Sequence, residues 1–261
     1  MIIEGRGISG GEGEGRLLLL RKPFSFLGGV DPVTGRLTSP DGEGESIRGR
    51  VFAFPRGKGS TVGSYVFLEL KRHGNLPIAI INESAEPIVA TGAVMTGVPM
   101  VDGVDLSFLE EDDWVHVDGH KGRVVLPDVR EVPVVTSILS HEERVLLLRR
   151  SEKVGSYRGK WACISGYLEG DEKPAMAARR EIREEVGEID LREISSTPVI
   201  HVRDGERMWS IHAFLFEVPS SKVRTDWEHV DHRWIAPEEV MDYEIVPGLV
   251  EVFKELNLLR S

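Results

Sequence analysis

The sequence predicts an α/β protein of two domains, and three observations support this prediction. The chain has 261 residues, enough for two ordinary domains that each bury a core. Apolar runs with strand and helix periodicity alternate through both halves of the chain. Between the halves lies the segment PDVREVP, in which two prolines enclose charged residues. We therefore place a first domain at residues 1–127, a linker at 128–133 and a second domain at 134–261.

The composition limits the classes of partner and compartment. The net charge of −11 at pH 7 would repel nucleic-acid backbones and anionic membranes, so we expect neither as a partner, whereas small phosphorylated substrates remain open. Cys163 is the single cysteine, so the chain cannot form an internal disulfide or hold an iron–sulfur cluster with its own thiols. We expect a cytoplasmic protein, because no leader peptide or long apolar run is visible. The absence of glutamine is typical of heat-adapted proteins.

The first domain begins with glycine-rich turns between short apolar runs, which predict ordered β structure. Strand and helix signals then alternate along the chain. The expected strands cover residues 15–20, 51–54 and 78–81, and a closing hairpin pairs 115–117 with 122–125.

A strand, a glycine turn and a helix form the first candidate site. After the strand at 51–54, residues 56–59 predict a turn and residues 61–72 a helix that starts at or near Ser60. The free N–H groups of a helix start, with Lys58 beside them, would attract an anion. The alternative is that Ser60 or Thr61 only caps the helix. The residues expected to face the core are Val62, Tyr65, Val66 and Leu70.

Four segments of the first domain carry a family resemblance. They are GRGISGGEGEG from Gly5, FLGGVDPVTG from Phe26, FPRGKGSTVGSYV from Phe54 and INESAEPIVATGAVMTGVPMVD from Ile81. In this order they resemble the swivelling small domain of the X branch of the aconitase superfamily, most closely the small subunit of archaeal phosphomevalonate dehydratase. The resemblance implies a swivelling β/β/α domain. It also implies a hydro-lyase of isoprenoid biosynthesis that converts mevalonate 5-phosphate into trans-anhydromevalonate 5-phosphate.

The resemblance also implies residue roles and a partner. Ser60 would be the catalytic, proton-abstracting residue, and Lys58, Gly59 and Thr61 would contact substrate. A separate large subunit would hold most of the substrate and carry the iron–sulfur cluster. A serine hydroxyl is a poor base in water, so this role requires a nearby cation or helix dipole to stabilise the alkoxide, for which Lys58 and the helix start are the visible candidates.

The second domain shows strand signals around one acidic helix. Cys163, Trp161 and Trp209 are expected in its core, although either tryptophan has the shape to stack on a base. The expected strands cover residues 134–139, 144–149, 197–202, 208–218 and 227–234, a short helix starts at 237, and a terminal helix covers 246–259.

The acidic helix forms the second candidate site. Glu181, Glu184 and Glu185 stand at i, i+3 and i+4, so on a helix they share one face. Three neighbouring carboxylates repel unless a cation neutralises them, and carboxylate oxygens suit Mg²⁺ or Mn²⁺. The alternative interpretation is a solvated acidic face without a ligand.

The spacing around this helix resembles the Nudix box in every polar position. Gly166 is followed after five residues by Glu172, after seven more by Arg180-Glu181-Ile182, and then by Glu184-Glu185 and Gly187. The resemblance implies a Nudix α/β/α sandwich with a mixed sheet. It assigns Glu181, Glu184 and Glu185 to the metal, the first two as catalytic, with Gly166 allowing backbone to approach the metal. Arg180 and Glu172 would form a structural ion pair. The chain departs from the pattern at Glu188, where the family has an apolar residue.

The implied reaction is Mg²⁺-dependent hydrolysis of a nucleoside diphosphate linked to another moiety, or of a related pyrophosphate. In this family the second strand commonly ends in arginines near substrate, which are Arg149 and Arg150 here, and Arg149 is our substrate-binding candidate. The general base is left open between a glutamate of the box, Glu228 and Glu238.

Three interpretations of the whole chain remain. The first is a bifunctional protein, a dehydratase small subunit joined to an active hydrolase. In the second, the Nudix domain only binds a nucleotide or an isoprenoid phosphate and regulates the dehydratase without catalysis. In the third, the chain is a Nudix hydrolase with a partner-binding first domain. The complete REIREE and GKGST motifs favour the first.

Overall fold

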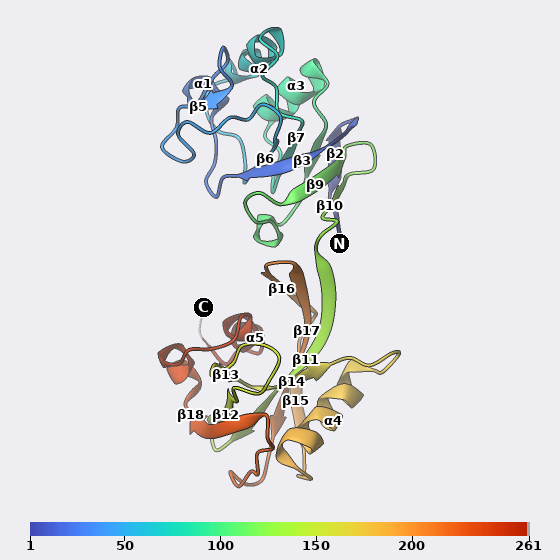
Figure 1. Ribbon diagram of the computed structural model, residues 1–261, viewed down its shortest axis with the longest axis vertical. Coiled ribbons are helices and arrows are strands. Elements are labelled where there is room, and N and C mark those ends of the chain that lie inside the picture. Colours follow the sequence, from blue (N-terminus) through green and yellow to red (C-terminus); the bar gives the residue numbers. More distant parts are fainter. Residues whose placement is uncertain (260–261) are drawn as a thin grey trace. The chain divides into compact units, whose positions relative to one another are not determined.

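The computed structural model describes residues 1–259 and divides into two compact units (Figure 1). The first unit spans Met1–Arg130, and the second begins at Glu131. Strand β11 (Arg130–His141) includes residues 130–133, the end of the segment expected to be a linker. Residues 260–261, which we assigned to the second domain, lie outside the described residues. Within residues 1–259, no helix is long and apolar enough to cross a membrane.

The first unit is built on a mixed sheet of eight strands in the order β1-β10-β9-β3-β6-β7-β8-β2. The pairs β3–β6, β6–β7 and β7–β8 are parallel, and the other pairs are antiparallel. The expected hairpin near the end of the first domain is confirmed by the pairing of β9 with β10. The strands are β1 (Ile2–Glu4), β2 (Arg6–Ser9), β3 (Glu12–Leu19), β6 (Val51–Phe54), β7 (Ala79–Asn82), β8 (Met100–Asp102), β9 (Trp114–Asp118) and β10 (Arg123–Val125), with a separate pair β4 (Val30–Asp31) and β5 (Arg36–Leu37).

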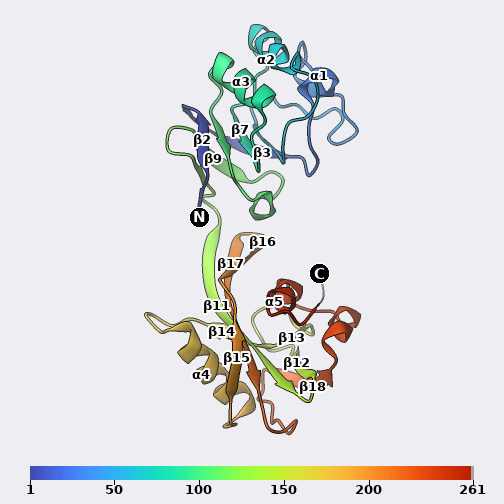
Figure 2. The same ribbon diagram turned by 180° about the vertical axis from the view of Figure 1, so that it is seen from behind.

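Two helices cover one face of this sheet and lie side by side (Figures 1 and 2). They are α2 (Gly63–Arg72) and α3 (Pro87–Thr96); the short α1 (Phe26–Gly29) and the 3-10 turn η1 (Leu106–Phe108) complete the unit. Their shared core is rich in phenylalanine, and the rings of Phe26 and Phe67 lie 4.2 Å apart between centroids. A Cβ at Gly92 would lie 2.3 Å from Phe67 Cδ2, so the two helices pack too closely there for a larger residue.

Helix α2 begins later than expected, and two side chains that were expected in the core are exposed. It begins at Gly63, because residues 60–62 form tight turns in which Gly63 N–H donates to Ser60 O at 2.8 Å. Ser60 is therefore not its N-cap residue. The expectation that Val62 and Tyr65 face the core was wrong, since they are 51% and 63% exposed, whereas Leu70 is buried as expected.

The second unit also has a mixed sheet of eight strands. Its main path runs β13-β12-β11-β17-β15, with β14 paired to β11, β16 to β17 and β18 to β12. Besides β11, the strands are β12 (Arg144–Arg150), β13 (Trp161–Ala162), β14 (Ile164–Tyr167), β15 (Arg192–Ser196), β16 (Ile200–Asp204), β17 (Arg207–Glu217) and β18 (His229–Ile235).

Helices lie on both sides of this sheet, which confirms the expected sandwich. Along β12, Leu146 and Leu148 pack toward α4 (Pro174–Val186), while Val145 and Leu147 pack toward α5 (Leu249–Glu255) and the 3-10 helix η2 (Pro237–Asp242). This alternation follows from the two-residue period of a strand, and both faces are apolar because both are covered.

The terminal helix is shorter than expected. Gly248 has a φ of +83° just before α5, and that left-handed conformation after Pro247 prevents the helix from starting at residue 246. The burial of Cys163, Trp161 and Trp209 is confirmed.

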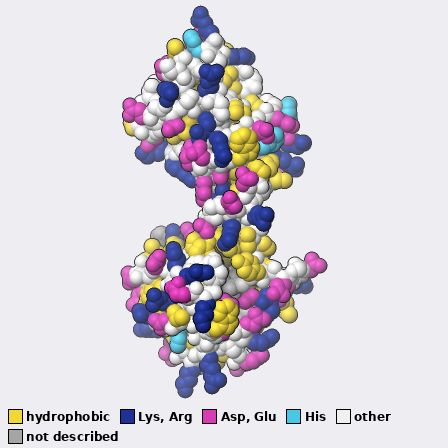
Figure 3. Space-filling model, in the orientation of Figure 1, with side chains coloured by type: hydrophobic (Ala, Val, Ile, Leu, Met, Phe, Trp, Pro, Cys, Tyr) yellow, Lys and Arg dark blue, Asp and Glu magenta, His cyan; other side chains and the backbone are white. Residues whose placement is uncertain are grey.

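The surface carries charges of both signs. On the face shown in Figure 3, basic and acidic side chains are interspersed over each unit, and neither sign forms one continuous area.

Candidate active sites

Ser60 lies on the exposed turn between β6 and α2. Its Oγ accepts a hydrogen bond of 3.4 Å from Val62 N–H, so the hydroxyl sits near the first free N–H groups of the helix. Gly59 precedes it with a φ of +109°, and a Cβ at that position would lie 2.8 Å from Ser25 Oγ. Glycine is thus required there for both conformation and space.

The turn is attached to a neighbouring loop by backbone hydrogen bonds. Lys58 N–H donates to Phe24 O at 2.9 Å, and Phe24 N–H donates to Arg56 O at 3.0 Å. Lys58 lines a hollow of about 250 Å³ together with Lys22 and several hydroxyl-bearing residues of the loops that follow β3. Thr61 is exposed, and its carbonyl accepts a hydrogen bond from Ser64 Oγ. The structure therefore groups Lys58, Gly59, Ser60 and Thr61 on one open loop.

The three glutamates of α4 occupy different environments. Glu185 is buried, with its side chain 6% exposed, while Glu184 is 58% exposed and Glu181 is 13% exposed. Among residues 1–259, no three His, Cys, Asp or Glu side chains form a group arranged to hold a metal ion. The three carboxylates share a helix face, but they do not converge on one point.

Glu185 is the carboxylate that best fits a cation. Its Oε1 accepts a hydrogen bond of 3.2 Å from Ser165 N–H, and its Oε2 is buried without a hydrogen-bond partner. Burial raises the pKa of Glu185 well above its ordinary value. A buried oxygen without a donor is costly, and a hard divalent cation would compensate it.

Glu181 packs directly against the backbone of Gly166. A Cβ at position 166 would lie 1.9 Å from the carboxyl carbon of Glu181, so any larger residue would displace this carboxylate. Burial raises the pKa of Glu181, and hydrogen bonding by Arg180 opposes that rise. Gly166 therefore brings the backbone of β14 next to the acidic helix.

Arg180 connects the helix to the loop before it. Its Nη2 lies 3.0 Å from Glu172 Oε2 and also donates to Tyr167 O at 3.1 Å. Its Nη1 lies 2.6 Å from Glu181 Oε1 and 3.4 Å from Glu184 Oε2. The hydrogen bond from Arg180 lowers the pKa of Glu172. One guanidinium thus balances part of the acidic face and holds the loop onto the helix.

Two residues near this face were not among our candidates. His229 at the start of β18 has its Nε2 3.5 Å from Glu185 Oε2 and its Nδ1 3.2 Å from Asp226 Oδ1. Burial lowers the pKa of His229, which favours its neutral form. The only sequence signal was the run of titratable residues from Asp226 to His229, since helix and strand are distant in the chain.

Glu228 and Glu238, the two candidate general bases outside the box, lie in different parts of the second unit. The charge of Glu228 raises the pKa of both Glu181 and Glu185, which places it near the acidic face. Glu238 lies on η2, which belongs to the opposite side of the sheet with α5. Glu228 is therefore the better candidate of the two.

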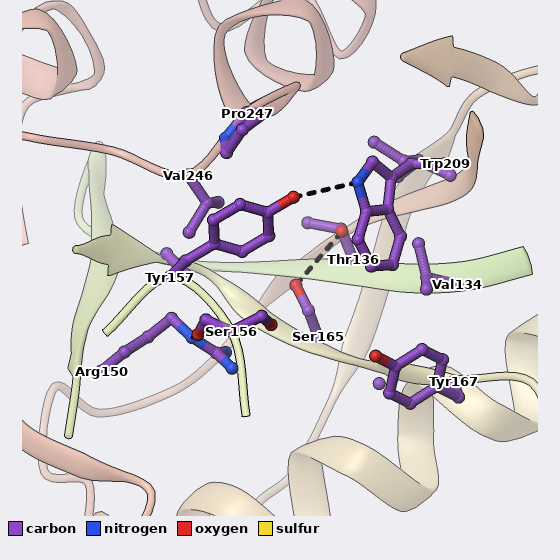
Figure 4. A pocket seen from close by; sticks show the side chains of 13 residues that line it. Val134, Thr136, Arg150, Ser156, Tyr157, Ser165, Tyr167, Trp209, Val246 and Pro247 are labelled. Carbon is purple, nitrogen blue, oxygen red and sulfur yellow. Dashed lines mark hydrogen bonds between the residues drawn. The ribbon is translucent and has the colours of Figure 1, made fainter. Parts of the chain in front are cut away.

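A pocket of about 100 Å³ opens beside Gly166 (Figure 4). Tyr157 and Trp209 form one wall, and Trp209 Nε1 donates to Tyr157 Oη at 3.0 Å. Thr136 and Ser165 face the pocket from β11 and β14, and their hydroxyl oxygens lie 3.2 Å apart. A second hollow, of about 340 Å³, adjoins this pocket and shares Arg150, Ser156 and Tyr167 with it.

Arg150, rather than Arg149, lines both hollows. A register shift between β12 and β18 at Arg149/Arg150 makes both arginines depart from simple strand alternation. Arg149 Nε instead donates to Gly159 O at 3.3 Å, and Arg150 Nε donates to Ser156 O at 3.0 Å. Arg150 thus lines both the pocket and the adjoining hollow, whereas our candidate Arg149 lines neither.

Comparisons with known proteins agree with these two units. Residues 2–126 match the family model of the aconitase X swivel domain, and residues 130–256 match that of the NUDIX domain. The chain is 55% identical over 126 residues to the phosphomevalonate dehydratase small subunit of Pyrococcus furiosus, an alignment that covers 48% of this chain and 94% of that protein.

Two solved structures resemble one unit each. The holo form of Thermococcus kodakaraensis aconitase X has 53% sequence identity and a TM-score of 0.47, covering 48% of this chain and 96% of that one. A MutT protein from Methanosarcina mazei Go1 has 24% identity and a TM-score of 0.42, covering 49% and 94%. The chain therefore belongs to the aconitase X swivel domain family through residues 2–126, and it carries a NUDIX domain at residues 130–256.

Proposed function

We propose that the chain is the small subunit of a phosphomevalonate dehydratase joined to a Mg²⁺-dependent Nudix hydrolase. The 55% identity to a curated small subunit, over 94% of its length, carries the first part of this proposal. For the second part, the buried Glu185, whose Oε2 accepts no hydrogen bond and lies 3.5 Å from His229 Nε2, favours a working metal site over a silent binding domain, as does its position beside Glu181 and Gly166.

In the dehydratase, Ser60 takes a proton from the carbon next to the one that bears the leaving hydroxyl group. Loss of water from mevalonate 5-phosphate then forms the carbon–carbon double bond of the product, trans-anhydromevalonate 5-phosphate. Lys58 and the start of α2 stabilise the Ser60 alkoxide, because both place positive charge on the same loop. The large subunit contributes the rest of the substrate site and an iron–sulfur cluster, which this chain cannot hold with Cys163 alone.

In the hydrolase, Glu181, Glu184 and Glu185 would hold Mg²⁺ or Mn²⁺. When bound, the ion supplies Lewis-acid stabilisation of the negative charge on the phosphate oxygens. Gly166 lets the β14 backbone lie against the carboxylates, and Arg180 with Glu172 keeps the loop before α4 in place. Glu228 accepts the proton of the attacking water, and Arg150 binds substrate phosphate.

Reconstitution tests both activities on the full chain. Mixed with a phosphomevalonate dehydratase large subunit, the chain is expected to form a stable complex that dehydrates mevalonate 5-phosphate. The same complex is expected to release phosphate or nucleotide from pyrophosphate substrates only when Mg²⁺ or Mn²⁺ is present. A complex that dehydrates but hydrolyses no pyrophosphate would favour the regulatory interpretation, and hydrolysis without assembly would favour a Nudix hydrolase with a partner-binding domain.

Replacing Gly166 with alanine tests the contact between β14 and the metal ligands. The new Cβ would displace Glu181, so Gly166→Ala is expected to weaken Mn²⁺ binding roughly 10-fold or more, as changes around metal ligands commonly do. Titration calorimetry with Mn²⁺ measures this effect, and thermal unfolding checks that the domain remains folded. An unchanged Mn²⁺ affinity would show that Gly166 does not position the ligands.

A further inference from the structure

We propose that the pocket beside Gly166 receives a short hydrocarbon group, so that the preferred substrate of the hydrolase is the diphosphate ester of such a group. This inference rests on the proposed hydrolase function and names its substrate class. A nucleotide, whose base would occupy the same pocket, is the competing occupant.

The walls of the pocket are mainly apolar (Figure 4). Val134 and Ile211 come from the adjacent strands β11 and β17, and Val246 and Pro247 come from the segment before α5. The aromatic side chains of Tyr157 and Trp209 add further apolar surface to these walls. Such walls favour an apolar ligand group, because its binding removes apolar surface of both partners from water.

Four of the polar side chains that line the pocket, those of Thr136, Ser165, Tyr157 and Trp209, already have protein partners. Ser165 Oγ donates to Cys163 O at 3.2 Å, which leaves Thr136 Oγ1 as the donor to Ser165 Oγ. Figure 4 shows this bond and the one from Trp209 Nε1 to Tyr157 Oη. Tyr157 Oη in turn donates to the carboxylate of Asp204.

This hydrogen bonding disfavours a nucleobase. The ring edges of a base carry donors and acceptors that lose water on burial, and they require protein partners in exchange. The donors of Thr136, Ser165, Tyr157 and Trp209 are all engaged with one another or with neighbouring groups. A hydrocarbon group makes no such demand.

The size of the pocket agrees with this occupant. An engineered apolar cavity of about 150 Å³ binds benzene. The pocket measures about 100 Å³, which is a suitable volume for a branched group of a few carbons.

The adjoining hollow supplies the charges that a diphosphate requires. Arg150, Lys153 and Arg207 line it, and Glu228 marks the side near the acidic face of α4. Arg150 borders both hollows, so it stands where the hydrocarbon and the first phosphate would meet. An apolar compartment joined to a cationic one matches a molecule with a hydrocarbon end and a diphosphate end.

The reaction of such a substrate balances without a further reactant. Water attacks the terminal phosphorus, a new P–O bond forms, and the bridging P–O bond breaks. The products are the hydrocarbon monophosphate and inorganic phosphate, and the proton of water passes through a carboxylate to solvent.

The first experiment compares substrates on the full chain with Mg²⁺. The probes are a five-carbon alkenyl diphosphate (isopentenyl diphosphate), ADP-ribose and GTP. We expect kcat/KM for the alkenyl diphosphate to exceed that for either nucleotide by roughly tenfold or more, the factor that corresponds to about 1.4 kcal/mol. A preference for a nucleotide would overturn the inference while supporting the proposed hydrolase, and failure to hydrolyse any of the three would overturn both.

The second experiment changes the shape of the pocket. Val134→Trp fills it, and we expect KM for the five-carbon probe to rise roughly tenfold, with calorimetric binding in the absence of metal weakened equally. Val246→Ala enlarges it, and we expect the ratio of kcat/KM for a ten-carbon diphosphate (geranyl diphosphate) to that for the five-carbon probe to increase. Thermal unfolding identifies a misfolded Val134→Trp, in which case the Val246→Ala ratio decides. An unchanged ratio would place the hydrocarbon elsewhere and overturn the inference.

Discussion

Ser60→Ala is expected to lower the rate of mevalonate 5-phosphate dehydration at least ~100-fold in the complex with the large subunit, since a positioned acid–base group contributes about 10²–10⁴-fold. The loss should appear in kcat, because Ser60 acts on the proton that moves in the reaction. Within residues 1–259 the exposed hydroxyl makes only a long hydrogen bond, to Val62 N–H at 3.4 Å, so the variant should fold and assemble normally.

A nearby serine provides the control for Ser60. Ser64 lies on the first turn of α2, where its hydroxyl donates to Thr61 O at 2.9 Å. Ser64→Ala removes a hydroxyl from the same region and one hydrogen bond to the backbone of Thr61, but it keeps the side chains of Ser60 and Lys58. Steady-state kinetics on both variants separates the two positions, and a Ser60→Ala complex with the wild-type kcat would remove Ser60 from the reaction.

Glu184→Gln is expected to reduce Mg²⁺-dependent hydrolysis at least ~100-fold, because Lewis-acid stabilisation contributes several kcal/mol and each about 1.4 kcal/mol is a factor of ten in rate. Glu184 is 58% exposed, so an isosteric amide there should leave the thermal midpoint unchanged. Calorimetry with Mn²⁺ should show weaker binding alongside the loss of turnover.

Glu188→Gln is the matched control for Glu184. Glu188 follows the end of α4, is 83% exposed and pairs with Arg183 at 2.8 Å, so its replacement removes one negative charge without affecting the carboxylates near Gly166. Turnover and Mn²⁺ affinity should remain at the wild-type level in this variant. If Glu184→Gln also retained both, Glu184 would not be a ligand, and Glu181, Glu185 and Glu228 would be the remaining set.

Most local structure in this chain was predictable because it depends on short-range patterns. The hairpin of β11 with β12 and the helix that carries Glu181, Glu184 and Glu185 follow from apolar periodicity and from spacing. The boundaries were less predictable. Helix α2 begins after two tight turns, and α5 begins after Gly248, since hydrogen bonding and a left-handed glycine override the apolar pattern.

The composition of the second site was only partly predictable. The box spacing named the helix and Gly166, but it did not identify His229, which reaches Glu185 from a strand far along the chain. The family resemblance at the end of the second strand pointed to Arg149 and Arg150, of which we chose Arg149, whereas the register shift beside β18 places Arg150 in the pocket lining. A contact between distant segments leaves no signal in the local sequence. A bulge moves the side chains that follow it to the side of the sheet opposite to the one that simple alternation predicts.

The sequence by itself determined that the chain combines two domains and that each has a motif with its own chemistry, on the loop of Ser60 and on the helix from Pro174 to Val186. Only the tertiary structure decided that the three glutamates differ in burial. It also decided that the pocket beside Gly166 has mainly apolar walls, and that the side chains of Thr136, Ser165, Tyr157 and Trp209 in these walls hydrogen-bond to one another. The physical reason is that burial and hydrogen-bond satisfaction depend on which distant strands pack together, and that packing is a property of the whole fold.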